Sequence, residues 1–169
     1  MTESEAPAVY GPPAFEAKVC APDDLASRLS ALPRPLVFTN GCFDILHSGH
    51  VTYLAQARAL GASLVVALNT DASVKRLGKG DDRPVNGLAD RLAVMASLEC
   101  VSLVTWFDED TPIARILECR PDVLVKGGDW PVERIVGAPE VQGWGGKVVS
   151  IPFEHARSTT ALLEKIRRL

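Results

Sequence analysis

Short runs of continuously apolar residues alternate along the chain with longer segments in which apolar residues recur at helical spacing. The apolar runs are rich in Val and Leu, a composition typical of strands that are buried on both faces of a sheet. In the longer segments the apolar residues lie three or four positions apart, as in Leu88, Leu92 and Met95. Five strands are predicted, at residues 36–38, 63–68, 102–107, 123–125 and 147–151.

Five helices are predicted between and around these runs. Gly61 is expected to end one of them as a C-cap, and Pro112 to lie at the first position of another. Strands that alternate with helices pair in parallel through right-handed crossovers. The pattern therefore predicts a doubly wound, Rossmann-like α/β fold with a parallel five-stranded sheet and helices on both faces. The helix that Gly61 is expected to end covers residues 49–60, and three more are predicted at residues 22–32, 87–100 and 159–169.

The chain of 169 residues is long enough for one hydrophobic core and short for two. Residues 1–15 contain three prolines and few large apolar side chains, which indicates a flexible N-terminal tail. The remaining residues, 16–169, are predicted to form a single domain.

Composition and charge exclude several classes of protein. The net charge of −3 and the pI of about 5.6 argue against a large non-specific nucleic-acid surface, which is usually basic. No apolar run approaches the ~18 residues of a membrane span, and the N-terminus lacks the pattern of a secretory signal. The four cysteines are scattered without a C-x-x-C pair, which favours reduced thiols and a cytoplasmic location.

Polar and glycine residues collect directly after the predicted strands. "TNGCFD" (39–44) follows the first strand, "KGGDW" (126–130) the fourth, and "STT" (158–160) comes after the fifth. Ligands of open α/β sheets bind beyond the carboxyl ends of the strands, so we expect one ligand site at this edge. Backbone N–H groups of glycines, helix N-termini and nearby lysines suit a polyphosphate. The G-x-G-x-x-G and P-loop patterns are absent.

His47 and His50 open three interpretations: metal ligands, core residues, or groups that face a ligand. A zinc site needs further ligands at converging positions, and no cysteine pair supplies them. Gly49 places the pair at a strand-to-helix turn, where ligand groups face outward. Imidazoles one helical turn apart share a face and could both donate to one phosphate chain.

The stretch "FTNGCFDILHSGH" resembles the signature of the cytidylyltransferase-like nucleotidyltransferases, whose H-x-G-H pattern is matched by residues 47–50. Within that superfamily the resemblance is closest to the D-glycero-β-D-manno-heptose 1-phosphate adenylyltransferases and covers roughly residues 34–169. The matching stretches are "NTDASVKRL", "RPVN", "FDEDTP", "DVLVKGGD", "IVGAPEV" and "STT".

The resemblance implies transfer of AMP from ATP to a heptose 1-phosphate, with release of pyrophosphate and with Mg²⁺ on the phosphates, for the lipopolysaccharide core. It implies catalytic roles for His47, His50 and Lys79, and a homodimer. No side chain is assigned to a metal. Contacts to the acceptor phosphate are implied for Lys75, Arg83 and Arg91. The residues implied to bind the nucleotide are Thr39, Asn40, Gly41, Cys42, Phe43, Asp44, His47, His50, Lys126, Gly128, Asp129, Ser158, Thr159 and Thr160.

Some of these residues have a plainer interpretation. Asp44 could simply brace its turn, and Arg91 could be a solvated helix residue. Trp130 is interpreted as a packing residue, and the acidic residues 108–110 as caps of the helix that follows them.

Two other functions stay open. One is a CTP-dependent glycerol- or alditol-phosphate cytidylyltransferase, which the "GGDW" stretch resembles, although "EHAR" before "STT" weighs against CTP. The other is a non-catalytic nucleotide-binding domain.

Overall fold

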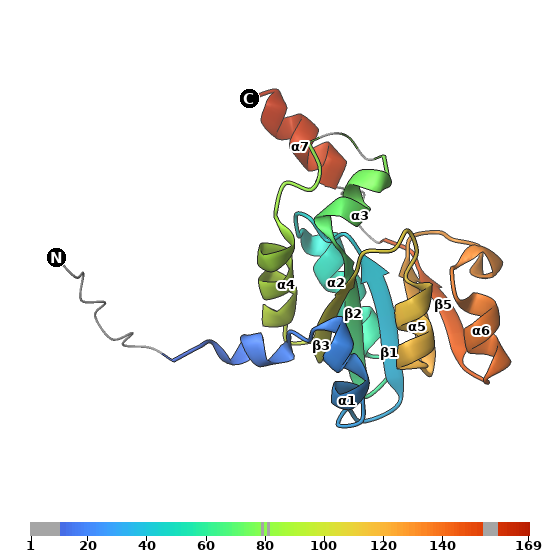
Figure 1. Cartoon of the computed structure of the whole chain (residues 1–169). Helices are drawn as coiled ribbons and strands as arrows, with labels where there is room; N and C mark the ends of the chain where they lie inside the picture. Colours follow the sequence, from blue (N-terminus) through green and yellow to red (C-terminus); the bar gives the residue numbers. More distant parts are fainter. Residues whose placement is uncertain (1–10, 79, 81, 154–158) are drawn as a thin grey trace.

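The fold is built on a five-stranded sheet in which every neighbouring pair of strands is parallel, in the order β3-β2-β1-β4-β5. The computed structural model describes residues 11–78, 80, 82–153 and 159–169. The predicted doubly wound fold is confirmed: β1 starts in the middle of the sheet, and the chain winds outward in both directions (Figure 1). The strands are β1 (Leu36–Gly41), β2 (Ser63–Asn69), β3 (Leu103–Phe107), β4 (Val123–Gly127) and β5 (Lys147–Ile151).

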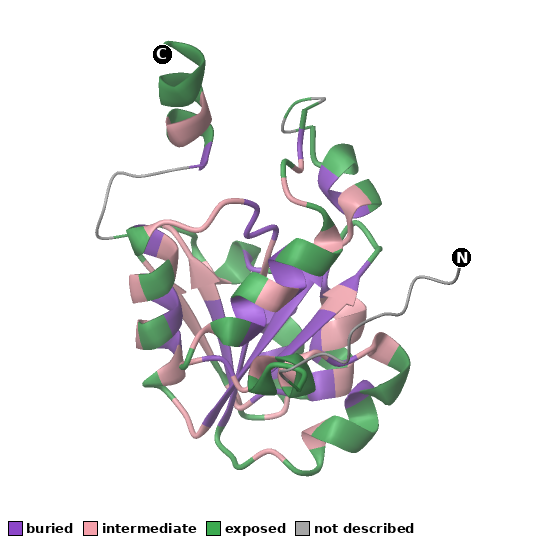
Figure 2. Ribbon diagram, turned by 90° about the vertical axis from the view of Figure 1, so that its left-hand side faces the viewer, coloured by how far each residue is buried: buried purple, intermediate pink, exposed green. Residues whose placement is uncertain are grey.

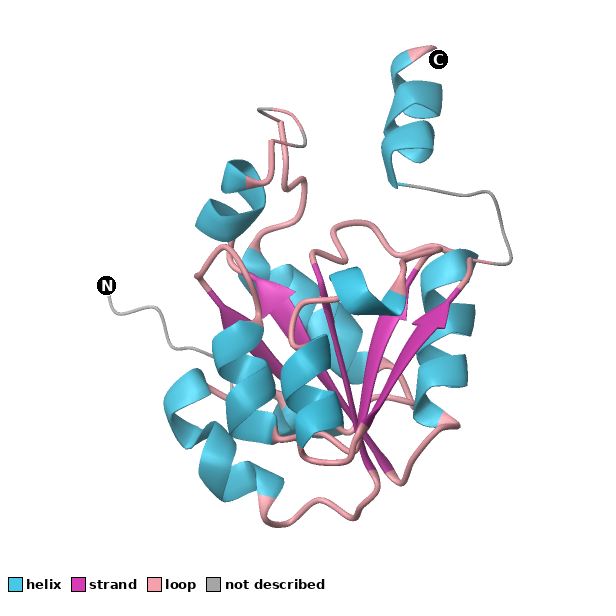
Figure 3. Ribbon diagram, turned by 90° about the vertical axis from the view of Figure 1, so that its right-hand side faces the viewer, coloured by secondary structure: helices cyan, strands magenta, loops and turns pink. Residues whose placement is uncertain are grey.

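Helices cover both faces of the sheet, as Figure 3 shows. Their apolar side chains divide into two buried clusters, one on each face. One cluster joins α2 and α4 to the sheet, and the other joins α1, α5 and α6 to it. The helices are α1 (Leu25–Leu29), α2 (Ser48–Arg58), α3 (Asp71–Arg76), α4 (Leu88–Ser97), α5 (Ile113–Cys119), α6 (Ala138–Gly143) and α7 (Thr159–Arg167), with 3-10 turns η1 (Ala14–Lys18), η2 (Pro22–Asp24) and η3 (Val132–Arg134).

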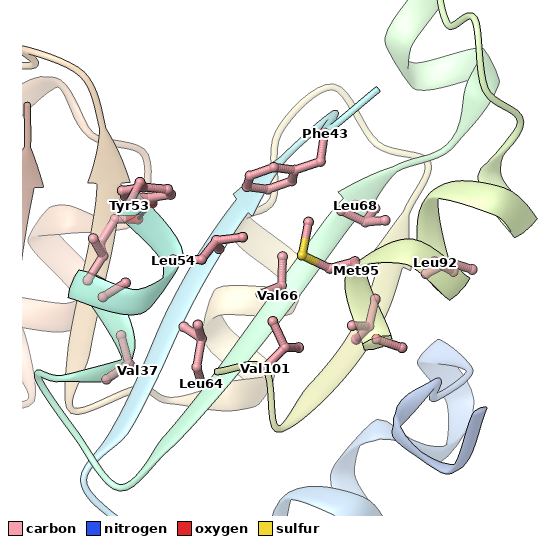
Figure 4. Packing of buried hydrophobic residues seen from close by; sticks show 14 of the residues in the cluster. Val37, Phe43, Tyr53, Leu54, Leu64, Val66, Leu68, Leu92, Met95 and Val101 are labelled. Carbon is pink, nitrogen blue, oxygen red and sulfur yellow. Dashed lines mark hydrogen bonds between the residues drawn. The ribbon is translucent and has the colours of Figure 1, made fainter. Parts of the chain in front are cut away.

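The central strands supply alternate residues to the two clusters because successive side chains of a strand point to opposite faces. Val66 of β2 lies beside Met95 of α4 in the first cluster (Figure 4), whereas its neighbour Val65 belongs to the second. All seven residues of β2 are buried. The buried strands lie between helices whose outer faces are exposed (Figure 2).

Three local expectations are wrong. Gly61 has no positive φ and so is not a left-handed C-cap; it is required for space instead, because a Cβ there would lie 2.5 Å from the carbonyl oxygen of Pro35. The helix expected from Pro112 begins one residue later, at Ile113. Its first turn receives no side-chain cap from the preceding acidic residues; Asp108 accepts from Thr70, at the start of α3, and Asp110 pairs with Arg76.

The segments that follow the strands lie at one end of the layered body. In Figure 1 the strand arrows point toward α3 and α7, while α1 lies at the opposite end. No helix within the described ranges is long and apolar enough to cross a membrane.

Candidate active site

A cavity of about 540 Å³ lies at the carboxyl ends of β1 and β4, between the first turns of α2 and α7. Its wall combines backbone of a turn, imidazoles, cationic side chains and aromatic rings. The residues that line it are Asn40, Gly41, Cys42, Phe43, Asp44, His47, His50, Tyr53, Arg83, Lys126, Gly127, Trp130, Phe153, Thr159 and Thr160.

The turn after β1 forms one side of the cavity. Phe43 has a φ of 45°, which few side chains other than Asn and Asp adopt readily, so tertiary contacts must hold it. Its ring folds back over Gly41, where a Cβ would lie only 2.9 Å from a ring carbon. Glycine at position 41 therefore leaves room for the ring while the backbone of the turn faces the cavity.

Asp44 fixes this turn to the loop before α4. Its carboxylate accepts hydrogen bonds from the backbone N–H groups of Val85 and Asn86 and from the Nε of Arg83, 2.6 Å away. Burial alone would raise the pKa of Asp44, but these donors and the nearby guanidinium outweigh it and hold the pKa below its usual value. The carboxylate is therefore ionised and hydrogen-bonded by these three donors, and it braces the turn as the plainer interpretation expected.

His47 and His50 lie against each other at the start of α2. Their ring centroids are 3.8 Å apart with an interplanar angle of 24°, and Phe43 contacts His50 edge-on at 5.3 Å. Burial and, to a smaller extent, the neighbouring His47 lower the pKa of His50 to about 4, against the opposing effect of the backbone carbonyl of Ile45. The imidazole of His50 is accordingly neutral at pH 7, and an anion in the cavity would favour its protonated form.

The first turn of α7 closes the cavity opposite the histidines. The hydroxyl of Thr159 donates to the carbonyl oxygen of Ile45, at 3.2 Å, and so joins α7 to the turn that carries His47. Thr160 also lines the cavity. Both α2 and α7 thus direct their N-terminal ends, which carry partial positive charge, toward the same space.

Aromatic rings form another part of the wall. Trp130 and Phe153 line the cavity and are 51% and 45% exposed, so both rings present surface to it. Phe153 meets Tyr53 edge-on at 5.8 Å. A Cβ at Gly127 would lie 2.7 Å from the Phe153 ring, so the ring occupies space that this glycine leaves open.

The structure brings together most of the residues that the sequence singles out. Two of them, Lys79 and Ser158, lie outside the described residues. Lys75 is exposed on α3, and Gly128 and Asp129 lie outside the cavity wall. The predicted residues that do line the cavity are Asn40, Gly41, Cys42, Phe43, Asp44, His47, His50, Arg83, Lys126, Thr159 and Thr160.

Two predicted residues lie beneath the site. Thr39 is fully buried in β1 and shares a hydrogen bond with the hydroxyl of Tyr53, a residue of the cavity wall. Arg91 is 2% exposed and is not the solvated helix residue of the plainer interpretation. Its three guanidinium nitrogens each donate to a protein oxygen.

Tyr53 and Phe153 were missed, whereas Gly127 lies within the stretch 126–129 that was expected to line the site. Tyr53 could have been found, because it lies three residues after His50 and so shares its helix face. Phe153 follows β5 and sits on the expected ligand edge, but no pattern marked it.

Nucleotidyl transfer generally uses a divalent metal ion. Within the described part of the chain, no three His, Cys, Asp or Glu side chains cluster as metal ligands. The carboxylate of Asp44 is already occupied by Arg83, Val85 and Asn86. The described side chains therefore do not form a protein ligand set for a metal ion.

Comparison with known proteins places this geometry in a family. The sequence profile described as cytidylyltransferase-like matches residues 38–161. The chain belongs to the cytidylyltransferase-like family. That match includes the turn after β1, both histidines and the start of α7, and it confirms the predicted nucleotidyltransferase class.

Individual relatives of this cytidylyltransferase-like chain are more specific. It is 58% identical over 156 residues to a D-beta-D-heptose 1-phosphate adenylyltransferase of Bordetella bronchiseptica, covering 91% of this chain and 96% of that protein. This similarity confirms the resemblance noted in the sequence. The chain is also 58% identical over 134 residues to the bifunctional protein HldE of Hahella chejuensis, of which it spans 28%.

Solved structures support the fold. A lipopolysaccharide core biosynthesis protein of Thermoplasma volcanium matches with a TM-score of 0.58 and 27% identity, over 72% of this chain and 98% of that one. A pantoate-beta-alanine ligase of Francisella tularensis matches with a TM-score of 0.59 and 15% identity, over 84% of this chain and 68% of that one. At that identity the second match concerns the fold alone.

Proposed function

We propose that this protein transfers AMP from ATP to D-glycero-β-D-manno-heptose 1-phosphate, giving ADP-heptose for the lipopolysaccharide core and pyrophosphate. The observation that carries the proposal is the 58% identity to a heptose 1-phosphate adenylyltransferase across 96% of that protein. The cavity with its histidine pair and cationic side chains gives independent support for a phosphate-containing substrate.

The reaction is an in-line displacement that requires no covalent enzyme intermediate. A phosphate oxygen of the sugar 1-phosphate attacks the α-phosphorus of ATP, and the bond from that phosphorus to the β-phosphate oxygen breaks, so that pyrophosphate leaves. Catalysis of such a transfer comes from positioning and from donors directed at the developing charge. His47 and His50 would supply these donors, together with the backbone N–H groups of the turn at residues 41–43.

The cationic side chains would bind the phosphate groups of the two substrates. Arg83 lines the cavity and is held by Asp44, which suits it to the acceptor phosphate or to the leaving pyrophosphate. Lys126, Thr159 and Thr160 would contact the nucleotide phosphates. Lys75 and Lys79, which follow β2 in the sequence, are further candidates for binding these phosphate groups.

The aromatic part of the wall suits the base of the nucleotide. Trp130 and Phe153 expose ring surface on which a base can stack, an interaction worth about 1–3 kcal/mol per base in proteins that bind single strands. Mg²⁺, which we propose arrives on the phosphates of ATP, would offset part of their charge.

Release of pyrophosphate from a panel of substrates tests the proposal. ATP and CTP are each combined with heptose 1-phosphate, with glycerol 3-phosphate, or with heptose that carries no phosphate, which is the control. We expect release only with ATP and heptose 1-phosphate. If pyrophosphate is released only from CTP with glycerol 3-phosphate, the protein is instead a cytidylyltransferase. Binding of ATP without release from any acceptor would identify a non-catalytic nucleotide-binding domain.

A further inference from the structure

Arg91 is the largest fully buried side chain in the described part of the chain, and it belongs to a helix that otherwise contributes apolar groups to the core. Its side chain is 0% exposed. Removal of a guanidinium from water is costly unless each donor finds an acceptor, so a buried arginine requires a specific set of partners.

Each of its three nitrogens donates to a different segment of the chain. Nε donates to the carbonyl oxygen of Asn86 at 3.0 Å, and Nη1 to that of Cys42 at 2.8 Å. Nη2 donates to the carboxylate of Asp71, at the start of α3, at 2.7 Å. The planar guanidinium therefore fixes the loop before α4, the turn after β1 and the start of α3 in one arrangement.

Two of these segments meet again at the cavity. The backbone N–H of Asn86 donates to the Asp44 carboxylate at 2.8 Å, and its side-chain amide donates to the Asp44 carbonyl oxygen at 2.7 Å. Asp44 in turn accepts from the Nε of Arg83. A continuous set of hydrogen bonds thus runs from Arg91 through Asn86 and Asp44 to Arg83, and of the two arginines only Arg83 lines the cavity.

We propose that Arg91 is a positioning residue that, through Asn86 and Asp44, orients Arg83 for binding of the substrate phosphates, with Asp71 as its counter-ion. The role rests on the proposed function insofar as Arg83 binds a phosphate. Arg91 itself makes no contact with substrate. A lysine at position 91 would keep the charge but has a single nitrogen on a flexible stem, which cannot hold three segments in a fixed plane.

The test is a double-mutant cycle read out as affinity for inorganic pyrophosphate, measured by calorimetry. The proteins are the wild type, Arg91→Lys, Arg83→Gln and the double variant. If Arg91 acts through Arg83, Arg91→Lys weakens binding by about tenfold, and the double variant binds no more weakly than Arg83→Gln alone. The proposal is overturned if Arg91→Lys binds pyrophosphate as tightly as the wild type does. It is also overturned if the double variant loses affinity by the product of the two single losses, or if the wild type binds no pyrophosphate.

Two further variants separate positioning from a general loss of stability. Leu92→Val trims the neighbouring buried residue of α4, so it should lower the unfolding temperature and leave pyrophosphate affinity unchanged. Asp71→Asn keeps an acceptor oxygen and removes the counter-charge. It should weaken binding by about threefold, and if Arg91→Lys fails to fold, wild-type affinity in Asp71→Asn overturns the proposal.

This readout is independent of the acceptor sugar and of the nucleotide base. A failure of the substrate panel would therefore leave the pyrophosphate cycle interpretable. An additive cycle, conversely, would refute the positioning role without changing the substrate assignment.

Discussion

The carboxylate of Asp44 and the Nε of Arg83 lie 2.6 Å apart, with side-chain exposures of 0% and 7%. The two residues are 39 positions apart in the chain and come from the turn after β1 and from the loop before α4. Both residues are buried and line the cavity, and Asp44 also accepts from two backbone N–H groups of that loop. The carboxylate that holds the turn in place therefore also fixes the position of the Arg83 guanidinium at the site.

Replacement of Asp44 by Asn should affect stability and activity together. Loss of one partner leaves the Arg83 charge buried without compensation, which typically costs about 3–5 kcal/mol. We expect the free energy of unfolding to fall by about 3 kcal/mol, because the Asn oxygen can still accept from the backbone N–H groups. Urea denaturation measures this loss, and pyrophosphate release should fall because Arg83 is no longer held.

Asp110→Asn is the matched control. Asp110 pairs with Arg76 at 2.8 Å, but the two side chains are 78% and 45% exposed. Exposed ion pairs contribute about 0–1 kcal/mol, so this variant should unfold almost like the wild type. An equal loss of unfolding free energy in the two variants would show that the buried Asp44–Arg83 pair stabilises the protein no more than an exposed pair does.

His50→Ala should lower turnover by on the order of 10²–10³, by analogy with the loss of one oxyanion donor. The ring lies in the cavity wall, so its removal should leave the folded structure intact, as circular dichroism would show. Val51→Ala is the control, because Val51 is the next residue of α2, is 44% exposed and does not line the cavity. Turnover of His50→Ala near that of Val51→Ala would exclude the proposed role of the histidine.

The stability of the free protein should depend on pH through His50. Its pKa is about 4 in the folded protein and about 6.5 in the unfolded chain, so between these values the unfolded chain binds more protons. The free energy of unfolding should therefore decline as the pH falls from 6.5 toward 4. In His50→Asn, urea denaturation across this range should show a smaller decline. An identical decline in both proteins would mean that other groups cause it.

Local sequence patterns predict the sheet and the histidine pair well, for physical reasons. A strand buried on both faces must be apolar throughout, so β2 is evident from its sequence. His47 and His50 are three positions apart at the start of α2, one as its N-cap and one in its first turn, and that spacing predicts that their rings lie together. The carboxyl-edge rule then brings Lys126 and Thr159 to the same place without knowledge of any long-range contact.

Other features depend on contacts that no local pattern encodes. Arg91 looks like any arginine on an amphipathic helix, and its burial depends on acceptors as distant as the carbonyl oxygen of Cys42, 49 positions away. The φ of Phe43 and the wall formed by Trp130 and Phe153 also depend on segments that are distant in sequence. The short helices α3 and α6 were missed because six residues are too few to show a clear apolar period.

Gly61 provides a test of packing at the end of the molecule away from the cavity. A Cβ there would lie 2.5 Å from the carbonyl oxygen of Pro35, and that oxygen is fixed because it accepts from the N–H groups of Ala62 and Ser63. Gly61→Ala should therefore lower the free energy of unfolding by about 1–3 kcal/mol, as overpacking does, and leave the KM for ATP unchanged. Gly143→Ala, at the end of α6 with nothing within 4 Å of its Cβ, should instead be neutral or more stable by about 0.4–1 kcal/mol. Equal effects of the two substitutions would show that the backbone around Pro35 shifts to accept a methyl group.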